Sequence, residues 1–133
     1  MRIGADYYPE HWEKERWKTD AEMMVKANIK VIRIGEFAWS LYEPEEGKYE
    51  FDWMDEALDF FGKYGIKVVM CTPSATPPKW MIDKYPDILQ NDIHGNPKLF
   101  GTRKHYCFNS ETYREKTKKL NTLIAKRLSL IHI

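Results

Sequence analysis

Three short runs typical of strands alternate with amphipathic helical patterns, and this alternation constrains the fold more than any other feature of the chain. The runs lie at residues 2–5, 30–34 and 66–71, and each is followed by a helical pattern. Strands that alternate with helices form a parallel sheet whose connections are right-handed crossovers. The sequence therefore predicts an α/β fold made of three consecutive βα units.

The predicted helices carry their own start and stop signals. Asp52 and Ser110 precede two of the helical patterns and are expected to cap them, because a short polar side chain can accept hydrogen bonds from the first free N–H groups. Asn28 and Gly65 follow the last apolar positions of two helices and are expected to end them. A further short helix is expected at residues 78–85, inside the long loop that follows the third strand.

Polar and aromatic residues follow each predicted strand, at residues 6–12, 35–40 and 72–76. A doubly wound sheet would use the same alternation, but no glycine-rich phosphate loop follows any strand. In a TIM barrel the three groups would meet on one rim, at the C-terminal ends of the strands. A complete barrel needs about 250 residues. We therefore expect the first three βα units of a TIM (β/α)8 barrel, an incomplete one.

Composition excludes several classes of partner. The net charge is +1, which gives no electrostatic reason to expect nucleic acid or a membrane surface. Two cysteines do not make a disulfide scaffold, and we see neither a signal peptide nor an apolar run long enough to cross a bilayer. A cytoplasmic protein with reduced thiols is expected.

Aromatic residues make up 14% of the chain, an excess that suits a site in which aromatic rings stack against sugars.

Arg33 is the least expected residue of its strand, because its neighbours in residues 31–34 are apolar. A buried guanidinium must be paired, normally with a carboxylate. The pair is either purely structural or holds a catalytic carboxylate in place, and the position at the strand end favours the second. Glu36 is expected to pair with Arg33 or to cap a turn. Tyr7, Arg33 and Ser74 are expected to line one hollow.

Other polar residues near the strand ends leave two interpretations open. Glu10 and His11 are either groups of the site or solvated turn residues beside Trp12. Trp39 is expected to pack in the core and not to face a sugar.

Another segment that is dense in aromatic and basic residues spans residues 100–107 (FGTRKHYC). Cys71 fits the usual cysteine, a small buried hydrophobe, whereas Cys107 lies in a polar loop beside His105. Cys107 could be one ligand of a zinc ion, but one ligand is not a site, since structural zinc takes four.

Five motifs in this order resemble the N-terminal part of family 42 β-galactosidases. They are residues 6–12 (DYYPEHW), 33–40 (RIGEFAWS), 43–47 (EPEEG), 72–80 (TPSATPPKW) and 103–107 (RKHYC). The resemblance runs from Met1 to about Arg127. It implies a TIM-barrel catalytic domain followed by two smaller domains, assembly as a homotrimer, and hydrolysis of terminal β-galactosides with retention of configuration.

The resemblance also implies roles for single residues. Arg103 matches the arginine that binds galactose hydroxyls, and Cys107 matches the first of four cysteines that bind zinc in many members. Arg33 would support the site near the nucleophile. The family's acid/base belongs to an Asn-Glu pair after the fourth strand, and no such pair occurs in this chain. No catalytic residue is therefore assigned here, and we expect the chain alone to be inactive.

Residues 128–133 (LSLIHI) depart from the family pattern. We expect residues 1–127 to be the N-terminal part of a barrel glycosidase domain and residues 128–133 to be a non-native tail, while a natural helix end is the other interpretation. Two other functions stay open: a different barrel glycosidase, cellulase-like or mannanase-like, and a sugar-binding fragment without catalysis.

Overall fold

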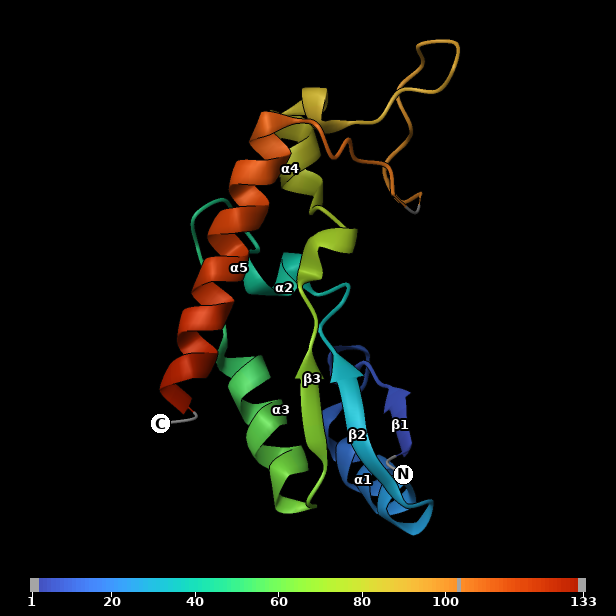
Figure 1. The fold of residues 1–133 in the computed structure, drawn as a ribbon, viewed down its shortest axis with the longest axis vertical. Helices are drawn as coiled ribbons and strands as arrows, with labels where there is room; N and C mark the ends of the chain where they lie inside the picture. Colours follow the sequence, from blue (N-terminus) through green and yellow to red (C-terminus); the bar gives the residue numbers. More distant parts are fainter. Residues whose placement is uncertain (1–2, 103, 132–133) are drawn as a thin grey trace.

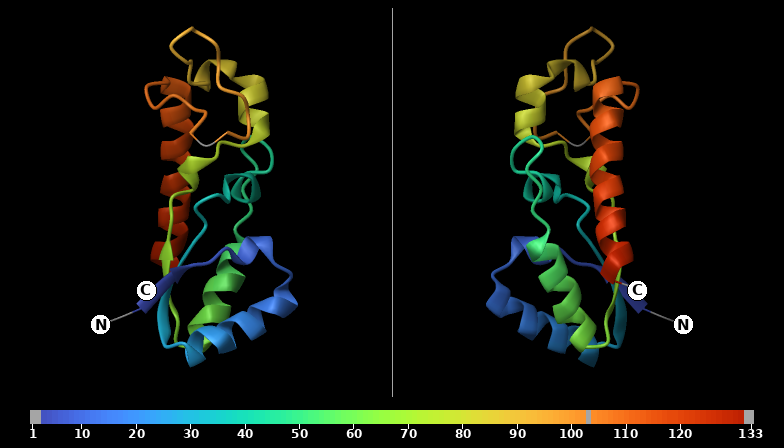
Figure 2. Two further views of the ribbon diagram at one scale, coloured as in Figure 1. Left: turned by 90° about the vertical axis from the view of Figure 1, so that its right-hand side faces the viewer. Right: turned by 90° about the vertical axis from the view of Figure 1, so that its left-hand side faces the viewer.

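The computed structural model describes residues 3–102 and 104–131 of the chain. Its centre is a parallel sheet of three strands in the order β1-β2-β3, which are β1 (Ile3–Asp6), β2 (Ile29–Ile34) and β3 (Lys67–Met70). Helices α1 (Lys14–Lys26) and α3 (Asp52–Lys63) cover one face of this sheet (Figure 1; Figure 2). The predicted α/β arrangement with parallel strands is confirmed.

The two faces of the sheet differ in burial. Ile32 and Ile34 of β2 are fully buried against α1 and α3, whereas Val69 on the opposite face is 51% exposed. Strand register places Asp6 beside Arg33, and Arg33 beside Val69, so these three residues form one row across the open face. Among the described residues, no helix covers this face (Figure 2).

Packing of the sheet against its helices forms the first hydrophobic core. Its larger buried side chains include Trp17 of α1 and Phe61 of α3, whose rings lie 6.1 Å apart between centroids. Burial of such large side chains is the main force that holds the helices on the sheet.

Helix ends agree with the predicted signals except at one position. Asn28 and Gly65 adopt left-handed backbone conformations after α1 and α3, with φ of 58° and 70°. The Tyr113 N–H donates to Ser110 Oγ at 3.3 Å, as expected of a cap. The predicted Asp52 cap is wrong, because Phe51 holds the cap position and Asp52 is already helical. There its carboxylate lies in the first turn, where a negative charge is favoured.

The remaining helices lie mostly beyond the C-terminal ends of the strands, but the last turns of the helix Glu111–Ile131 run down beside α3, where Arg127 pairs with Asp55 (Figure 1). These helices are η1 (Pro9–His11), α2 (Trp39–Tyr42), η2 (Pro73–Ala75), α4 (Lys79–Lys84), η3 (Pro86–Ile88) and α5 (Glu111–Ile131). The α4 helix confirms the short helix predicted inside the long loop.

A second hydrophobic core holds these upper elements together. Trp39 of α2, Met81 of α4 and Leu120 of α5 are among its buried side chains. Met70, at the end of β3, packs against both cores. Gly35 lies at the same junction with φ of 81°, and a Cβ atom there would sit 3.0 Å from Tyr42 Oη and 3.1 Å from Met70 Sδ. Only glycine fits this position without displacing the two side chains that join the cores.

Three strands form a small parallel sheet and not a closed barrel. Across the described part of the chain, no helix combines the length and the apolar character needed to cross a membrane.

Candidate functional site

Arg33 and two carboxylates form an ion-pair cluster at the C-terminal ends of β1 and β2. Arg33 Nε donates to Asp6 Oδ1 at 2.7 Å, and its Nη2 donates to Asp6 Oδ2 at 3.2 Å and to Glu36 Oε2 at 2.6 Å. The expected pairing of Arg33 with Glu36 is therefore confirmed. The expected burial is wrong, because the Arg33 side chain is 41% exposed on the open face of the sheet.

Electrostatics favour the charged forms of Asp6 and Arg33. The hydrogen bonds from Arg33 hold the pKa of the Asp6 carboxyl below its usual value. The same bonds, together with the nearby negative charges, raise the pKa of the guanidinium. One arginine thus orients two carboxylates by forked, charge-assisted bonds, an arrangement that a lysine would not reproduce.

Tyr7 does not lie with this cluster, which corrects the expected hollow of Tyr7, Arg33 and Ser74. Its hydroxyl donates to Asp20 Oδ2 of α1 at 2.9 Å, and its ring meets Phe61 edge-on at 5.4 Å. Successive residues of a strand point to opposite faces, so Tyr7 faces the helices when Asp6 faces Arg33. Burial and the bond to Asp20 raise the pKa of Tyr7.

The segments that follow the three strands nevertheless contact one another. The rings of Tyr8, after β1, and Phe37, after β2, lie 5.6 Å apart between centroids. Thr76, after β3, donates its hydroxyl hydrogen to the Phe37 carbonyl at 3.2 Å. The Tyr113 hydroxyl of α5 donates to the Ser74 carbonyl oxygen at 2.6 Å, and this bond links the segment after β3 to α5. The predicted convergence of the strand-end segments on one rim is therefore confirmed for these residues.

A hollow of about 490 Å³ opens beside this rim. The segments after β2 and β3 form one wall, and residues 100–102 with His105 form the other. Aromatic, hydroxyl and basic side chains line it, among them Phe37, Ser40, Thr76, Lys79, Phe100 and His105. Arg103, the residue expected to bind substrate, lies outside the described residues.

Cys107 does not complete a metal site by itself. Its backbone N–H donates to the Ile88 carbonyl at 2.7 Å, and its thiol is half-buried. Within residues 3–102 and 104–131, no group of three or more His, Cys, Asp or Glu side chains could hold a metal ion. Since structural zinc needs four ligands, the described residues supply only the one expected ligand, Cys107, and the zinc ion stays a prediction. Cys71 is half-buried too, less than expected, and its burial raises the pKa of its thiol.

The two interpretations of Glu10 and His11 can now be separated in part. His11 is exposed and stacks on Tyr8 at 5.4 Å, as a solvated turn residue would. Both carboxylate oxygens of Glu10 are buried, with no hydrogen-bond partner among the described residues, and this desolvation raises the pKa of its carboxyl. Trp39 is fully buried, which confirms its expected place in the core.

Two carboxylates were not singled out from the sequence. Asp6 was one of several polar residues after the first strand, although its place at the end of a strand next to Arg33 could have marked it as the partner. Glu43 is 1% exposed and accepts hydrogen bonds from Trp39 Nε1 at 3.0 Å and from the Gly47 N–H at 2.9 Å. Its spacing of four residues from Trp39 on one helical face was the available signal.

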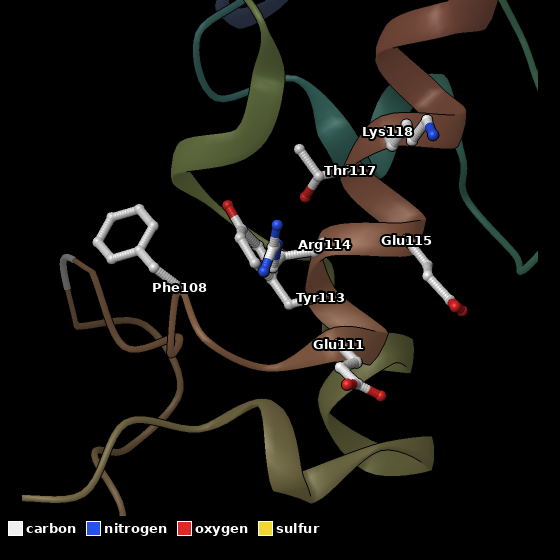
Figure 3. Close-up of a pocket in the computed structure, with 7 residues that line it drawn as sticks. All are labelled: Phe108, Glu111, Tyr113, Arg114, Glu115, Thr117 and Lys118. Atoms are coloured by element: carbon white, nitrogen blue, oxygen red, sulfur yellow. The ribbon is translucent and has the colours of Figure 1, made fainter.

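A second hollow, of about 650 Å³, lies on the first turns of α5 (Figure 3). Tyr113, Arg114 and Thr117 line it together with Phe108, which precedes the helix. Two carboxylates, Glu111 and Glu115, are among its lining, but both belong to α5 and none of the lining residues follows a strand. The Arg33 cluster and the 490 Å³ hollow remain the candidate site.

Comparison with known proteins finds relatives that match nearly the whole chain. A family profile described as Beta-galactosidase, that of glycoside hydrolase family 42, matches residues 6–130. The chain is 54% identical over 125 residues to a β-galactosidase of Thermus thermophilus and 48% identical over 127 residues to β-galactosidase BgaH of Haloferax lucentense. These alignments cover 94% and 96% of this chain and 19% of each relative.

Solved structures match equally well. The polyextremophilic β-galactosidase of Halorubrum lacusprofundi superposes with a TM-score of 0.91 at 45% identity, over 96% of this chain and 19% of that one. The β-galactosidase of a Bacillus circulans strain superposes with a TM-score of 0.93 at 35% identity, over 97% of this chain and again 19% of the other. The chain thus spans about a fifth of the length of its relatives.

Proposed function

This chain belongs to the family 42 β-galactosidases, and we propose that it forms the first part of an enzyme that hydrolyses terminal β-D-galactosides with retention of configuration. The observation that carries the proposal is the 54% identity, over 94% of the chain, to a protein named as a β-galactosidase. The position of the Arg33 cluster at the ends of parallel strands supports it, since active sites of α/β barrels lie there.

Retaining glycosidases use two carboxyl groups about 5 Å apart. One protonates the glycosidic oxygen, the other attacks the anomeric carbon, and water then releases the sugar with help from the first. Neither glutamate is assigned in this chain. Its residues would instead build one wall of the site: Arg33 holds Asp6 and Glu36 in place, and Arg103 would bind galactose hydroxyls. The 133-residue chain alone is therefore expected to be inactive.

The complete enzyme would close the sheet into a TIM barrel. The open row of Asp6, Arg33 and Val69 would then face the barrel interior, which explains why an arginine and a half-exposed valine share a face with no covering helix. Assembly as a homotrimer, a cytoplasmic location and a zinc site that includes Cys107 stay predictions from the family resemblance or from composition.

A chimera provides the direct test. Residues 1–127 would replace the matching segment of the Thermus thermophilus β-galactosidase, and the product would be assayed against aryl β-galactosides, β-glucosides and β-mannosides. We expect hydrolysis of the galactoside with retention, read by NMR of the first-formed sugar. The same enzyme without the segment, and the isolated 133-residue chain, serve as controls and should show no turnover.

Three results would contradict the proposal. Turnover of an aryl β-galactoside by the pure 133-residue chain would mean that it contains its own catalytic groups. A folded chimera that cleaves only β-glucosides or β-mannosides would favour the cellulase-like or mannanase-like alternative. Galactose binding without turnover in the chimera would favour the sugar-binding alternative. Sequencing the DNA downstream of codon 127 adds an independent check, since an in-frame Asn-Glu pair is expected there.

A further inference from the structure

The hollow of about 650 Å³ on the first turns of α5 has no role in the proposed function, although it is larger than the hollow beside the rim. We call it the α5 hollow. Phe108 forms one wall, and side chains of α5 between Glu111 and Lys118 form the other (Figure 3). The lining and its place in the fold together indicate what covers it.

One wall is a fixed aromatic group. The rings of Tyr106 and Tyr113 stack at 4.4 Å between centroids, and Phe108 meets Tyr106 edge-on at 5.1 Å. Phe108 is nevertheless 62% exposed, whereas Tyr113 is buried. An apolar group that covered this ring would remove apolar surface from water, and the ring, already held by its neighbours, would lose little freedom. We therefore expect an apolar contact at Phe108.

The other wall carries charges of both signs. Arg114 and Lys118 line it together with Glu111 and Glu115, and all four residues are exposed. Across residues 3–102 and 104–131, none of the four forms an ion pair. A ligand with a single charge would meet repulsion as well as attraction here. A polypeptide segment suits such a wall better, because its backbone presents both N–H donors and C=O acceptors.

Contacts near its two ends fix the direction of α5. Near its start, the Tyr113 hydroxyl donates to the Ser74 carbonyl oxygen at 2.6 Å, in the segment after β3. Near its end, Arg127 pairs with Asp55 in the first turn of α3. The helix α5 therefore starts beyond the C-terminal end of β3 and runs back toward the helix layer, antiparallel to the strand (Figure 1).

The strand β3 has a free edge, because among the described strands it pairs with β2 alone. In the barrel that the proposed function implies, the next strand pairs with this edge in parallel, reached by a right-handed crossover. The chain leaves α5 at the end far from the α5 hollow, so the fourth strand would run back toward it. The segment after that strand would therefore emerge beside the first turns of α5.

We propose that the α5 hollow holds the segment that follows the fourth strand of the complete enzyme. An apolar side chain of that segment covers Phe108, and its backbone forms hydrogen bonds with the charged side chains of α5. The inference rests on the proposed function, which supplies the complete barrel. Segments that follow the strands carry the active-site groups of such barrels, so Phe108 and Arg114 are positioning residues that act on the site through this segment.

Photo-crosslinking in the chimera described above tests the contact directly. The variant is Arg114→p-benzoylphenylalanine, whose ketone inserts into nearby C–H bonds on illumination, and mass spectrometry identifies the linked peptides. A connection of about four residues and a strand of about six place the start of the segment about ten residues beyond the end of α5. Lys126→p-benzoylphenylalanine is the matched control, because Lys126 is exposed on the same helix and lies outside the hollow.

We expect position 114 to link to the segment between the fourth strand and the next helix, and position 126 not to do so. A link from position 114 to a second copy of the chimera, or to a part of it beyond the barrel, would overturn the proposal, because another occupant would then cover the hollow. A folded chimera that forms no link from position 114 would overturn it as well.

Hydrogen exchange read by mass spectrometry measures the role of Phe108. In Phe108→Ala we expect the amides of the segment after the fourth strand to exchange about five- to tenfold faster, the loss of one good contact, while those of β1, β2 and β3 stay unchanged. Phe100→Ala is the control, because Phe100 is another exposed phenylalanine and lies outside the α5 hollow. Unchanged exchange in the segment, or an equal increase in Phe100→Ala, would contradict the proposal.

Neither measurement uses turnover, so the two proposals can fail separately. A chimera that cleaved only β-glucosides would refute the proposed function, and a link from position 114 to the expected segment would still support the contact. A chimera that hydrolysed aryl β-galactosides but linked position 114 to another region would refute this proposal alone.

Discussion

Replacement of Val69 by glutamate should have opposite consequences in the isolated chain and in a complete barrel. In the chain, Val69 is 51% exposed on the open face of the sheet and lies beside Arg33 of the neighbouring strand. A carboxylate there stays in water and faces a guanidinium. The loss of valine's preference for strands costs up to about 1 kcal/mol. A charge on an exposed apolar face should also reduce association between sheets.

In a closed barrel the same carboxylate would lose its water. Arg33 already donates to Asp6 and Glu36 and cannot neutralise a third carboxylate. An uncompensated buried charge costs about 3–5 kcal/mol, a large part of the stability of a typical domain. With a shift of about 2–4 °C per kcal/mol, Tm of the chimera should fall by roughly 10 °C.

Differential scanning calorimetry of the chimera and sedimentation velocity of the isolated chain measure the two effects. Ile93→Glu is the control, because Ile93 is 95% exposed in the long loop and its replacement should be neutral in both proteins. If the Val69→Glu chimera melted within about 2 °C of its parent, a shift that corresponds to no more than about 1 kcal/mol, the open face would not be the interior of a barrel and the reasoning would be refuted.

Three further predictions concern the chimera. Arg33→Lys loses the forked bonds to Asp6, so the pKa of Asp6 should rise toward its ordinary value in an NMR titration while kcat/KM falls at least about tenfold. Glu43→Ala leaves the Trp39 indole N–H without its acceptor in a buried site, and urea denaturation should show a loss of about 2–4 kcal/mol. Ion pairs with two lysines lower the pKa of Glu46 to about 2, below its ordinary 4.5, so its contribution to stability is complete above pH 4.5 and is lost as pH falls toward 2. Glu46→Gln should therefore flatten that part of the acid-denaturation curve, and an unchanged curve would count against these ion pairs.

Periodicity predicted the layout of the chain well, because strand and helix patterns are local. The three strands, the two covering helices and the short helix in the long loop all follow from the spacing of apolar residues and from turn signals. Asp6, the partner of Arg33, could also have been predicted from the sequence. A charged residue inside an apolar strand demands a counter-charge, and the neighbouring strand end supplies one.

The direction of Tyr7 could not be predicted, because it depends on where the first strand ends. The predicted strand stops at Ala5, whereas pairing in the structure continues to the Tyr7 N–H, which donates to the Arg33 carbonyl at 3.0 Å. That register turns Tyr7 toward the helices. The exposure of Arg33 could not be predicted either, because burial of a strand residue depends on what covers that face of the sheet and not on the strand itself. Glu43 belongs to an acidic stretch that resembles a solvated turn, and only the tertiary position of Trp39 buries it.

The division of apolar packing into two cores, joined at Met70 and Gly35, has a consequence for how such a chain can change. The loops of the rim pack mainly on the second core, which meets the βα layers at Met54 of α3 and Met70 of β3. Selection for a different sugar could therefore substitute rim residues one at a time, while the sheet and its covering helices retained their stability. Position 35, at the junction, has no such freedom, because a side chain there would clash with both Tyr42 and Met70.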